Sequence, residues 1–176
     1  MTDSIFTGTK IFLRALEPED LELLYKWEND TDIWNVSETL SPVSKFILKR
    51  YLENAHKDIF ETKQLRLVIQ LKTESKPVGM IDLFDFDHFH KRAAVGILIG
   101  EKDERRQGYA AEAIDILKRY CFEVLRIHQL YCSISVSNSS SLELFQKAGF
   151  IITGTRKEWN WMGESYMDEH FLQLIR

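Results

Sequence analysis

The stretch from Ala93 to Leu125 reads AAVGILIGEKDERRQGYAAEAIDILKRYCFEVL, and this stretch decides the fold. It begins with an apolar run of strand length, Ala93 to Ile99, which ends at Gly100. Its last part has the three- and four-residue apolar spacing of a half-buried helix, carried by Ala110, Ala113, Ile114, Leu117, Cys121 and Val124. A strand that enters a helix through a polar turn, Glu101 to Gln107, leaves backbone N–H groups unpaired at the helix start. The sequence therefore predicts an anion site at this turn, with phosphate as its usual occupant.

The turn also carries a recognisable pattern. Two common nucleotide-binding patterns are absent, since there is no G-x-x-x-x-G-K-S/T and no G-x-G-x-x-G after the strand. The turn instead contains Arg105-x-x-Gly108-x-Ala110. This resembles the pyrophosphate-binding signature Q/R-x-x-G-x-G/A of the GCN5-related N-acetyltransferases. The alternative is that Gly108 only permits a tight turn and that the neighbouring arginines are solvated.

A second signature lies toward the C-terminus. Asn138-x-x-Ser141, followed by FQKAGF from Phe145 to Phe150, resembles N-x-x-S/A-x-x-x-Y-x-K-x-G-F of the same family, in which the asparagine contacts the coenzyme. The resemblance implies that acetyl-CoA is the co-substrate. An open strand edge over Ile97 to Ile99 would pair with the amides of its pantetheine arm, and a backbone N–H of that strand would stabilise the oxyanion. The residues expected to bind acetyl-CoA are Ile97, Leu98, Ile99, Arg105, Arg106, Gln107, Gly108, Tyr109, Ala110, Ala111, Asn138, Ser141, Phe145 and Lys147.

Hydrophobic patterns predict the remaining elements. A strand over Lys10–Leu13 precedes a helix that starts at Pro18 and ends near Trp27, and Ser41-Pro42 is expected to open a second helix. Strands are predicted at Leu65–Leu71 and Val78–Phe86, which form a hairpin with a bulge at Leu83-Phe84. Further strands are predicted at Leu130–Val136, Ile151–Trp161 and Tyr166–Ile175, and a helix at Ser141–Ala148. The resemblance implies the acyl-CoA N-acyltransferase fold. That fold is α/β (α+β), a mixed, mostly antiparallel twisted sheet of about six or seven strands with about four flanking helices.

Length and composition restrict the function classes. A chain of 176 residues with 44% hydrophobic and 28% charged residues suits one domain over residues 1–176. No apolar run approaches the roughly 20 residues of a membrane span, and the N-terminus lacks a signal layout, so we expect a cytoplasmic protein. A net charge of −4 without a basic stripe argues against nucleic acid. Cys121 and Cys132 lack C-x-x-C spacing, which argues against a disulfide framework and a zinc site.

The acceptor is expected beside the hairpin and the first helices. The segment from Asp85 to Ala93 resembles spermidine acetyltransferases, whose corresponding region borders the acceptor pocket. In the family the region between the first two helices forms another wall. The resemblance therefore implies substrate contacts by Trp34, Glu38, Asp82, Asp85 and His88. His88 and His90 would share a strand face, but nothing supplies the further ligands that a metal needs, so no metal is expected.

Two positions depart from the spermidine branch. Phe145 replaces the tyrosine that protonates the departing thiolate in many relatives, and Ala94 replaces a glutamate of the central strand. The ribosomal-protein alanine acetyltransferase branch also lacks the tyrosine, and resemblance to it implies Ser141 as the acid and Glu158 as the base. An amine with a pKa of roughly 10.4 is almost fully protonated at neutral pH, so it needs such a base.

Two function classes remain. The leading interpretation is an acetyl-CoA-dependent N-acetyltransferase whose acceptor is a small polyamine or a protein N-terminal amine. The other is a non-catalytic CoA-binding regulatory module, which the departures at Phe145 and Ala94 would favour. Neither nucleic acid nor a membrane is an expected partner. Relatives commonly self-associate, so a homo-oligomer is one outcome that the resemblance allows.

Overall fold

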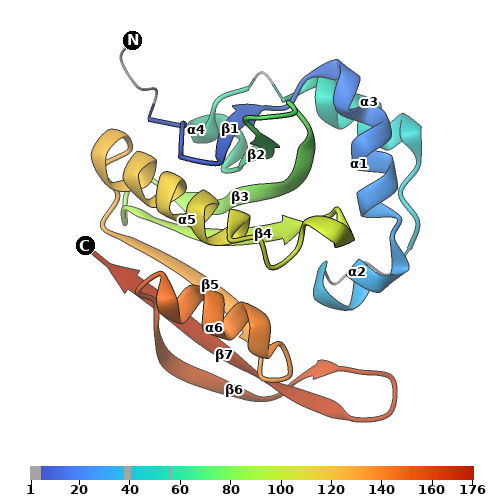
Figure 1. Cartoon of the computed structure of the whole chain (residues 1–176). Helices are drawn as coiled ribbons and strands as arrows, with labels where there is room; N and C mark the ends of the chain where they lie inside the picture. Colours follow the sequence, from blue (N-terminus) through green and yellow to red (C-terminus); the bar gives the residue numbers. More distant parts are fainter. Residues whose placement is uncertain (1–4, 38–40, 56) are drawn as a thin grey trace.

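A single twisted sheet of seven strands organises the computed structural model, which describes residues 5–37, 41–55 and 57–176 (Figure 1). The strand order is β1-β2-β3-β4-β5-β7-β6. Only the β4–β5 pair is parallel, and all other neighbours are antiparallel. The strands are β1 (Ile11–Ala15), β2 (Leu65–Leu71), β3 (Pro77–Asp87), β4 (Arg92–Ile99), β5 (Gln129–Ser135), β6 (Ile151–Trp161) and β7 (Tyr166–Ile175). The expected mixed, mostly antiparallel sheet is confirmed.

The parallel pair at the centre of the sheet is short. β4 pairs with β5 only at Arg92, Ala93 and Ala94, opposite Gln129, Leu130 and Tyr131. From Val95 onward β4 keeps its partner β3, but no strand among the described residues pairs with its other edge. The open edge that the sequence predicted at Ile97–Ile99 is therefore present, and it begins two residues earlier.

Helices cover both faces of the sheet (Figure 1). They are α1 (Leu21–Glu28), α2 (Thr31–Ser37), α3 (Lys45–Glu53), α4 (Ile59–Thr62), α5 (Tyr109–Arg119) and α6 (Ser139–Lys147). The residues of α5 and α6 join the main core cluster, whereas α1 and α3 form a second cluster with Met80 and Leu98. Since side chains alternate across a strand, these clusters lie on opposite faces of β3 and β4. Six α-helices thus occur in the described residues, where about four were expected.

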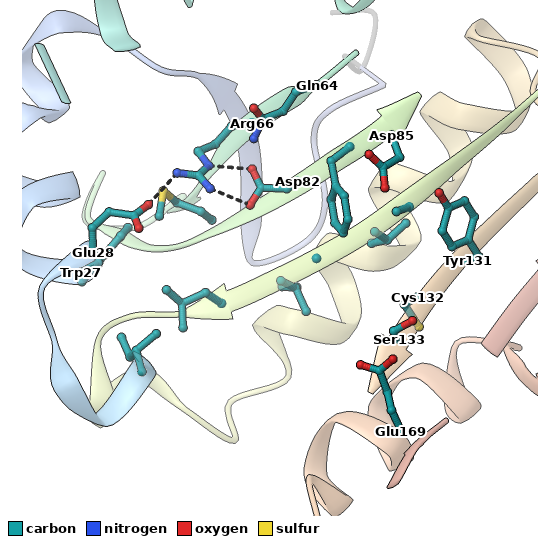
Figure 2. A pocket seen from close by; sticks show the side chains of 18 of the residues that line it. Trp27, Glu28, Gln64, Arg66, Asp82, Asp85, Tyr131, Cys132, Ser133 and Glu169 are labelled. Carbon is teal, nitrogen blue, oxygen red and sulfur yellow. Dashed lines mark hydrogen bonds and ion pairs between the residues drawn. The ribbon is translucent and has the colours of Figure 1, made fainter. Parts of the chain in front are cut away.

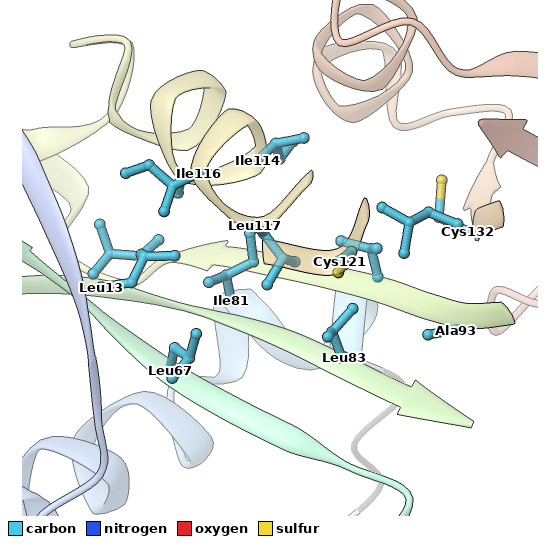
Figure 3. Close-up of a cluster of buried hydrophobic side chains, with 14 of the residues drawn as sticks. Leu13, Leu67, Ile81, Leu83, Ala93, Ile114, Ile116, Leu117, Cys121 and Cys132 are labelled. Carbon is cyan, nitrogen blue, oxygen red and sulfur yellow. The ribbon is translucent and has the colours of Figure 1, made fainter. Parts of the chain in front are cut away.

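The main core lies between the sheet and α5. Ile116 and Leu117 of α5 point toward the strand residues Leu13 and Ile81 (Figure 3). Each such side chain, when fully buried, stabilises the fold by about 1.5–3 kcal/mol relative to exposure. The two cysteines belong to this core, and burial raises the pKa of each thiol.

The end of the long helix differs from the prediction. Val124 was expected to be buried but is 54% exposed, whereas Ile116, which the predicted stripe omitted, is 1% exposed. The helix changes at Tyr120 into a π-helical turn, in which Leu125 N–H donates to the Tyr120 carbonyl. This wider turn rotates the following side chains away from the 3.6-residue phase.

Two N-terminal predictions were wrong. The second long helix starts after Ser44, whose hydroxyl accepts a hydrogen bond from Ile47 N–H, and not at Ser41-Pro42. No helix was predicted between the one ending near Trp27 and the one expected at Ser41-Pro42, but this region contains α2. The Asp30 carboxylate accepts from Asp32 N–H at the start of α2, so a local cap supports a helix whose apolar pattern is weak. Among the described residues, no helix combines the length and the apolar character needed to cross a membrane.

Candidate active site

Two hollows lie along the cleft where β4 and β5 separate. The first, of about 840 Å³, extends to the sheet face that α1 and α3 cover, and we call it the acidic hollow (Figure 2). Four carboxylates and two guanidiniums line it, namely Glu28, Asp82, Asp85, Glu169, Arg66 and Arg156. Aromatic rings complete its walls, contributed by Trp27, Phe84, Tyr131 and Trp159. The excess of negative charge favours a cationic ligand.

The second hollow, of about 880 Å³, lies beside α6, and we call it the serine hollow. Its hydroxyl groups come from Ser133, Ser135, Ser137 and Ser141. Asn138, Phe145 and Trp34 also line it, so residues expected for the coenzyme meet one expected for the acceptor wall.

The two hollows share a set of lining residues, which we call the junction. The junction consists of Val95, Gly96, Ile97, Cys132, Ser133, Trp159 and Glu169. It includes the first part of the open β4 edge, where backbone groups face the cleft. A group that passes from a ligand in one hollow to a ligand in the other would pass through the junction.

A largely buried ion-pair cluster forms one wall of the acidic hollow (Figure 2). Arg66 on β2 donates from Nε to Asp82 Oδ1 and from Nη1 to Glu28 Oε1, both at 2.7 Å. Burial raises the pKa of the Asp82 carboxyl, and the Arg66 guanidinium opposes that rise. The Arg66 guanidinium lies 5.6 Å from the centroid of the Tyr51 ring, and burial raises the pKa of the Tyr51 hydroxyl. Asp82 and Glu28 are therefore held by Arg66.

Asp85 is the carboxylate of the acidic hollow that has no hydrogen bond or ion pair among the described residues. The bulge of β3 was expected at Leu83-Phe84, but the pairing register with β4 shifts after it, between Phe84 and Asp87, where Asp85 has a φ of 49°. Burial is the main cause that raises the pKa of Tyr131 opposite, and the negative charge of Asp85 adds to it. Asp85 is thus available to a ligand.

The expected anion site adopts a conformation that suits an anion. Gly108 has φ 86° directly before α5, and Arg106 has φ 62°. The amides of Tyr109, Ala110 and Ala111 lie in the first turn of α5, where no intrahelical acceptor exists. Arg105 donates from Nε to the Ile99 carbonyl, which connects the turn to the end of β4. Arg106 and Gln107 lie in the same turn, so two arginines and the free amides of the helix start are close together, as an anion site requires.

Lys10, which directly precedes β1, lies beside this turn, and the sequence pattern did not predict it. Its ammonium donates to the Gln107 carbonyl at 3.1 Å. Its backbone N–H donates to the Glu112 carboxylate of α5, which fixes the start of β1 beside the helix. No local pattern could reveal Lys10, because 97 positions separate it from Gln107 and only the packing of β1 against α5 joins them.

Ion pairs join this turn to the helices that border the acidic hollow. Glu101 accepts from Lys26 at 2.6 Å and from the Trp27 indole N–H at 3.0 Å, and the Lys26 hydrogen bond is the main cause that lowers its pKa. Lys102 pairs with Asp32 at 2.5 Å. The positions of α1 and α2 are therefore connected to the expected anion site.

The α6 signature serves both the fold and the serine hollow. Asn138 Oδ1 accepts from Ser141 N–H at 3.1 Å, so Asn138 is the N-cap. Ser141 and Phe145 line the hollow, and the ring of Phe145 packs edge-on against Phe150. Lys147 lies on the exposed side of α6, pairs with Glu143, and lines neither hollow.

Three other residues, Trp34, Glu38 and His88, were expected to contact the substrate. Trp34 lies in α2, not in a loop, and its indole N–H donates to the Glu28 carbonyl. Glu38 lies outside the described residues. His88 lies in the exposed turn after β3, where its ring meets the edge of Phe60, so it does not reach the cleft.

The expected base is also displaced. Glu158 lies at an irregularity of β6, with φ 50°, and its N–H donates to Asp168. Its side chain is exposed and lines neither hollow. Its position therefore does not support the role of base, because the irregularity turns Trp159 into the cleft instead.

A buried carboxylate lies at the junction where Glu158 was expected. Glu169 on β7 is 5% exposed, and Arg156 donates to it at 2.6 Å. The alternation of β7 places Glu169 on the face opposite Leu172, which is in the main core. Local alternation alone therefore suggests an exposed residue, whereas in the fold Glu169 is buried and paired with Arg156 from the neighbouring strand.

Known proteins resemble this chain in sequence and in fold. The model of the acetyltransferase (GNAT) domain matches residues 10–151. The spermidine N(1)-acetyltransferase of Escherichia coli K12 is 27% identical over 164 residues, which cover 93% of this chain and 82% of that protein. An uncharacterized prophage-derived N-acetyltransferase of Bacillus subtilis is 26% identical, with 96% and 91% covered. The structure of a Vibrio cholerae spermidine N-acetyltransferase in complex with CoA and spermine superimposes with a TM-score of 0.86 at 22% identity, with 96% of each chain covered.

Proposed function

The chain belongs to the acetyltransferase (GNAT) family, and on this premise we propose that it transfers the acetyl group of acetyl-CoA to a primary amine of a small polyamine. The acidic hollow carries the assignment of the acceptor, because its lining has four carboxylates against two guanidiniums. A polyamine is a chain of ammonium groups at neutral pH and complements such a lining. The relative from Escherichia coli, which is similar over 93% of this chain, is a spermidine N(1)-acetyltransferase.

The residues of the chain fit the coenzyme. The first-turn amides of α5, together with Arg105, Arg106 and Lys10, would hold its pyrophosphate at the positive end of the helix dipole. The open β4 edge from Val95 to Ile99 would pair with the amides of the pantetheine arm. Acetyl-CoA supplies an acetyl thioester when bound. A backbone N–H of the same edge, at the junction, would donate to the carbonyl oxygen as negative charge develops on it.

The acidic hollow would hold the acceptor. Asp85 is free to pair with an ammonium group, while Arg66 occupies Asp82 and Glu28. The rings of Phe84 and Tyr131 suit the methylene segments of a polyamine and add cation–π attraction. This arrangement supports direct attack of a bound amine on the thioester, since the two hollows meet at the junction.

The test is release of thiol from acetyl-CoA by the full chain. Spermidine, spermine, short diamines, aminoglycosides and peptides with free N-termini are compared with a blank that lacks an acceptor. We expect the highest kcat/KM with the polyamines. Turnover with peptides alone would contradict the polyamine assignment and favour the ribosomal-protein branch. Silence with every amine, while CoA still binds, would favour the non-catalytic module.

Asp85→Asn tests the acceptor site directly. We expect the KM for spermidine to rise about 10-fold, because a charge-assisted contact of about 1.5–3 kcal/mol is lost at a site that solvent partly screens. The KM for acetyl-CoA should stay within about twofold. Asparagine tolerates the positive φ of this position, so the backbone should keep its course.

The matched control for this substitution is Asp115→Asn, on the exposed side of α5, where Asp115 pairs with Lys118. It removes the same charge from the chain without touching the hollow. An equal change of the spermidine KM in both variants would show that only the net charge matters and would contradict a contact by Asp85.

A further inference from the structure

Glu169 has a special position in the cleft. Among the seven junction residues, it is the one carboxyl side chain in the described part of the chain. The other six are three apolar residues, a glycine, a serine and Cys132. Burial raises the pKa of the Cys132 thiol to about 12. Glu169 is therefore the one carboxylate, among the described residues, that lines the place where a ligand in one hollow meets a ligand in the other.

The hydrogen bonds of Glu169 leave one oxygen available. Oε1 accepts from Arg156 Nη1 at 2.6 Å, and the same nitrogen lies 3.2 Å from Ser133 Oγ. Oε2 has only a long contact of 3.4 Å from Asn160 Nδ2 among the described residues. The rings of Trp159 and Phe171 face the Arg156 guanidinium, with centroids at 5.0 and 5.5 Å. The two rings hold Arg156 in place, and Arg156 in turn orients the carboxylate through Oε1. Oε2 has only the weak hydrogen bond from Asn160.

We propose that Glu169 is the proton acceptor for the amine, through Oε2 directly or through one water molecule, a role that rests on the proposed acetyl transfer. The ammonium of the acceptor gives one proton to Glu169 and becomes a nucleophile. The nitrogen then forms the C–N bond with the acetyl carbon as the C–S bond breaks. The second proton of the nitrogen goes to the departing sulfur, since Phe145 has no proton to give. Glu169 returns its own proton to solvent, which completes the balance.

Other ionisable groups around the junction are less suited. Asp82 and Glu28 are paired with Arg66, and Asp85 lies at the far end of β3 beside Tyr131. The groups that face Glu169 or line the same hollow are Arg156 from β6, Cys132 and Tyr131 from β5, Asp82 and Asp85 from β3, Arg66 from β2 and Glu28 from α1. None of these other carboxylates lines the serine hollow.

The test compares Glu169→Gln with the wild-type chain on the amine of the panel that gives the highest rate. A failure of polyamine preference thus leaves this experiment intact. We expect kcat to fall about 100-fold at pH 7, the typical contribution of a positioned base, with little change in the KM for acetyl-CoA. The loss should shrink as the pH approaches the amine pKa of roughly 10.4, because the amine then loses its proton without help. It should also be smaller with glycinamide, whose amine resembles an α-amino group of pKa roughly 7.7–8.0.

Two variants serve as controls. Glu164→Gln removes a charge from the exposed turn of the same hairpin and should retain wild-type activity. Glu169→Asp keeps a carboxylate and should retain part of the rate with a wild-type pH profile. A Glu169→Gln rate within twofold of wild type would overturn the proposal. A loss that is equal at every pH and for both amines would also overturn it, because that result indicates a structural role.

Discussion

Replacement of Arg66 by methionine is expected to lower the free energy of unfolding by about 3–5 kcal/mol at pH 7. Arg66 is paired with two carboxylates, Asp82 and Glu28, each at 2.7 Å, and all three side chains are largely buried. Methionine fills similar space but leaves two negative charges near each other without a counter-charge. Such a broken pair is more unfavourable than the loss of the contact alone, because the remaining charges stay desolvated.

The pH dependence of the stability of the Arg66→Met variant shows whether the uncompensated carboxylates cause the loss. Burial already raises the pKa of Asp82 above its usual 3.8, and the loss of Arg66 would raise it further. A carboxyl whose folded-state pKa is raised binds more protons in the folded than in the unfolded state, so stability falls as the pH rises through this window. The deficit of the variant should therefore be small near pH 4 and should grow toward neutral pH. Urea unfolding at both pH values measures it.

Matched variants separate this effect from a general loss of positive charge. Arg50→Met, on the exposed side of α3, should change stability by less than about 0.5 kcal/mol. Adding Asp82→Asn to Arg66→Met should restore part of the stability, since one of the two uncompensated charges is removed. A deficit that does not vary with pH would contradict the ion-pair explanation.

Gly108→Val is expected to raise the KM for acetyl-CoA about 100-fold. Gly108 has φ 86° where the turn enters α5, and a β-branched residue in this region costs about 1–3 kcal/mol. A shift that relieves the strain would also redirect the amides of Tyr109 and Ala110 away from the pyrophosphate. A charge-assisted contact of about 1.5–3 kcal/mol is then lost, and each 1.4 kcal/mol corresponds to a factor of ten.

Calorimetric titration with CoA and steady-state kinetics measure this change. Gly149→Val is a matched control, because Gly149 has φ 97° at the end of α6 and has no expected contact with the pyrophosphate. It should lower stability to a similar degree without the large change in affinity. If both variants lost affinity equally, the effect would come from general destabilisation rather than from the turn.

The order of elements could be predicted because it depends on local patterns. Alternation identified the two hairpins, and the spacing from Ala110 to Cys121 identified the helix that packs on the core. The predictions failed where local signals compete. Ser44, not Ser41, caps α3, and the π-helical turn after Arg119 exposes Val124. Periodicity alone predicts neither the capping residue of α3 nor the exposure of Val124.

The site was predicted only in part for a similar reason. The residues of the anion turn are contiguous, and their conformation depends on a glycine at positive φ, so the pattern at Arg105, Gly108 and Ala110 was sufficient to locate them. The charges of the cleft come from distant segments. The expected base Glu158 lies outside the cleft at a strand irregularity, while Glu169, on the neighbouring strand, lies inside.

The sequence by itself determined the family, the alternation of strands and helices and the conformation of the turn for which pyrophosphate binding is predicted, because each depends on neighbours within a few residues. Only the tertiary structure decided where the cleft lies and which charges face it. β4 separates from β5 after Ala94, Lys10 meets Gln107 through β1 and α5, and Arg156 covers Glu169 from the next strand. These contacts join residues that are far apart in the chain or on different strands, so their geometry follows from packing and not from local sequence.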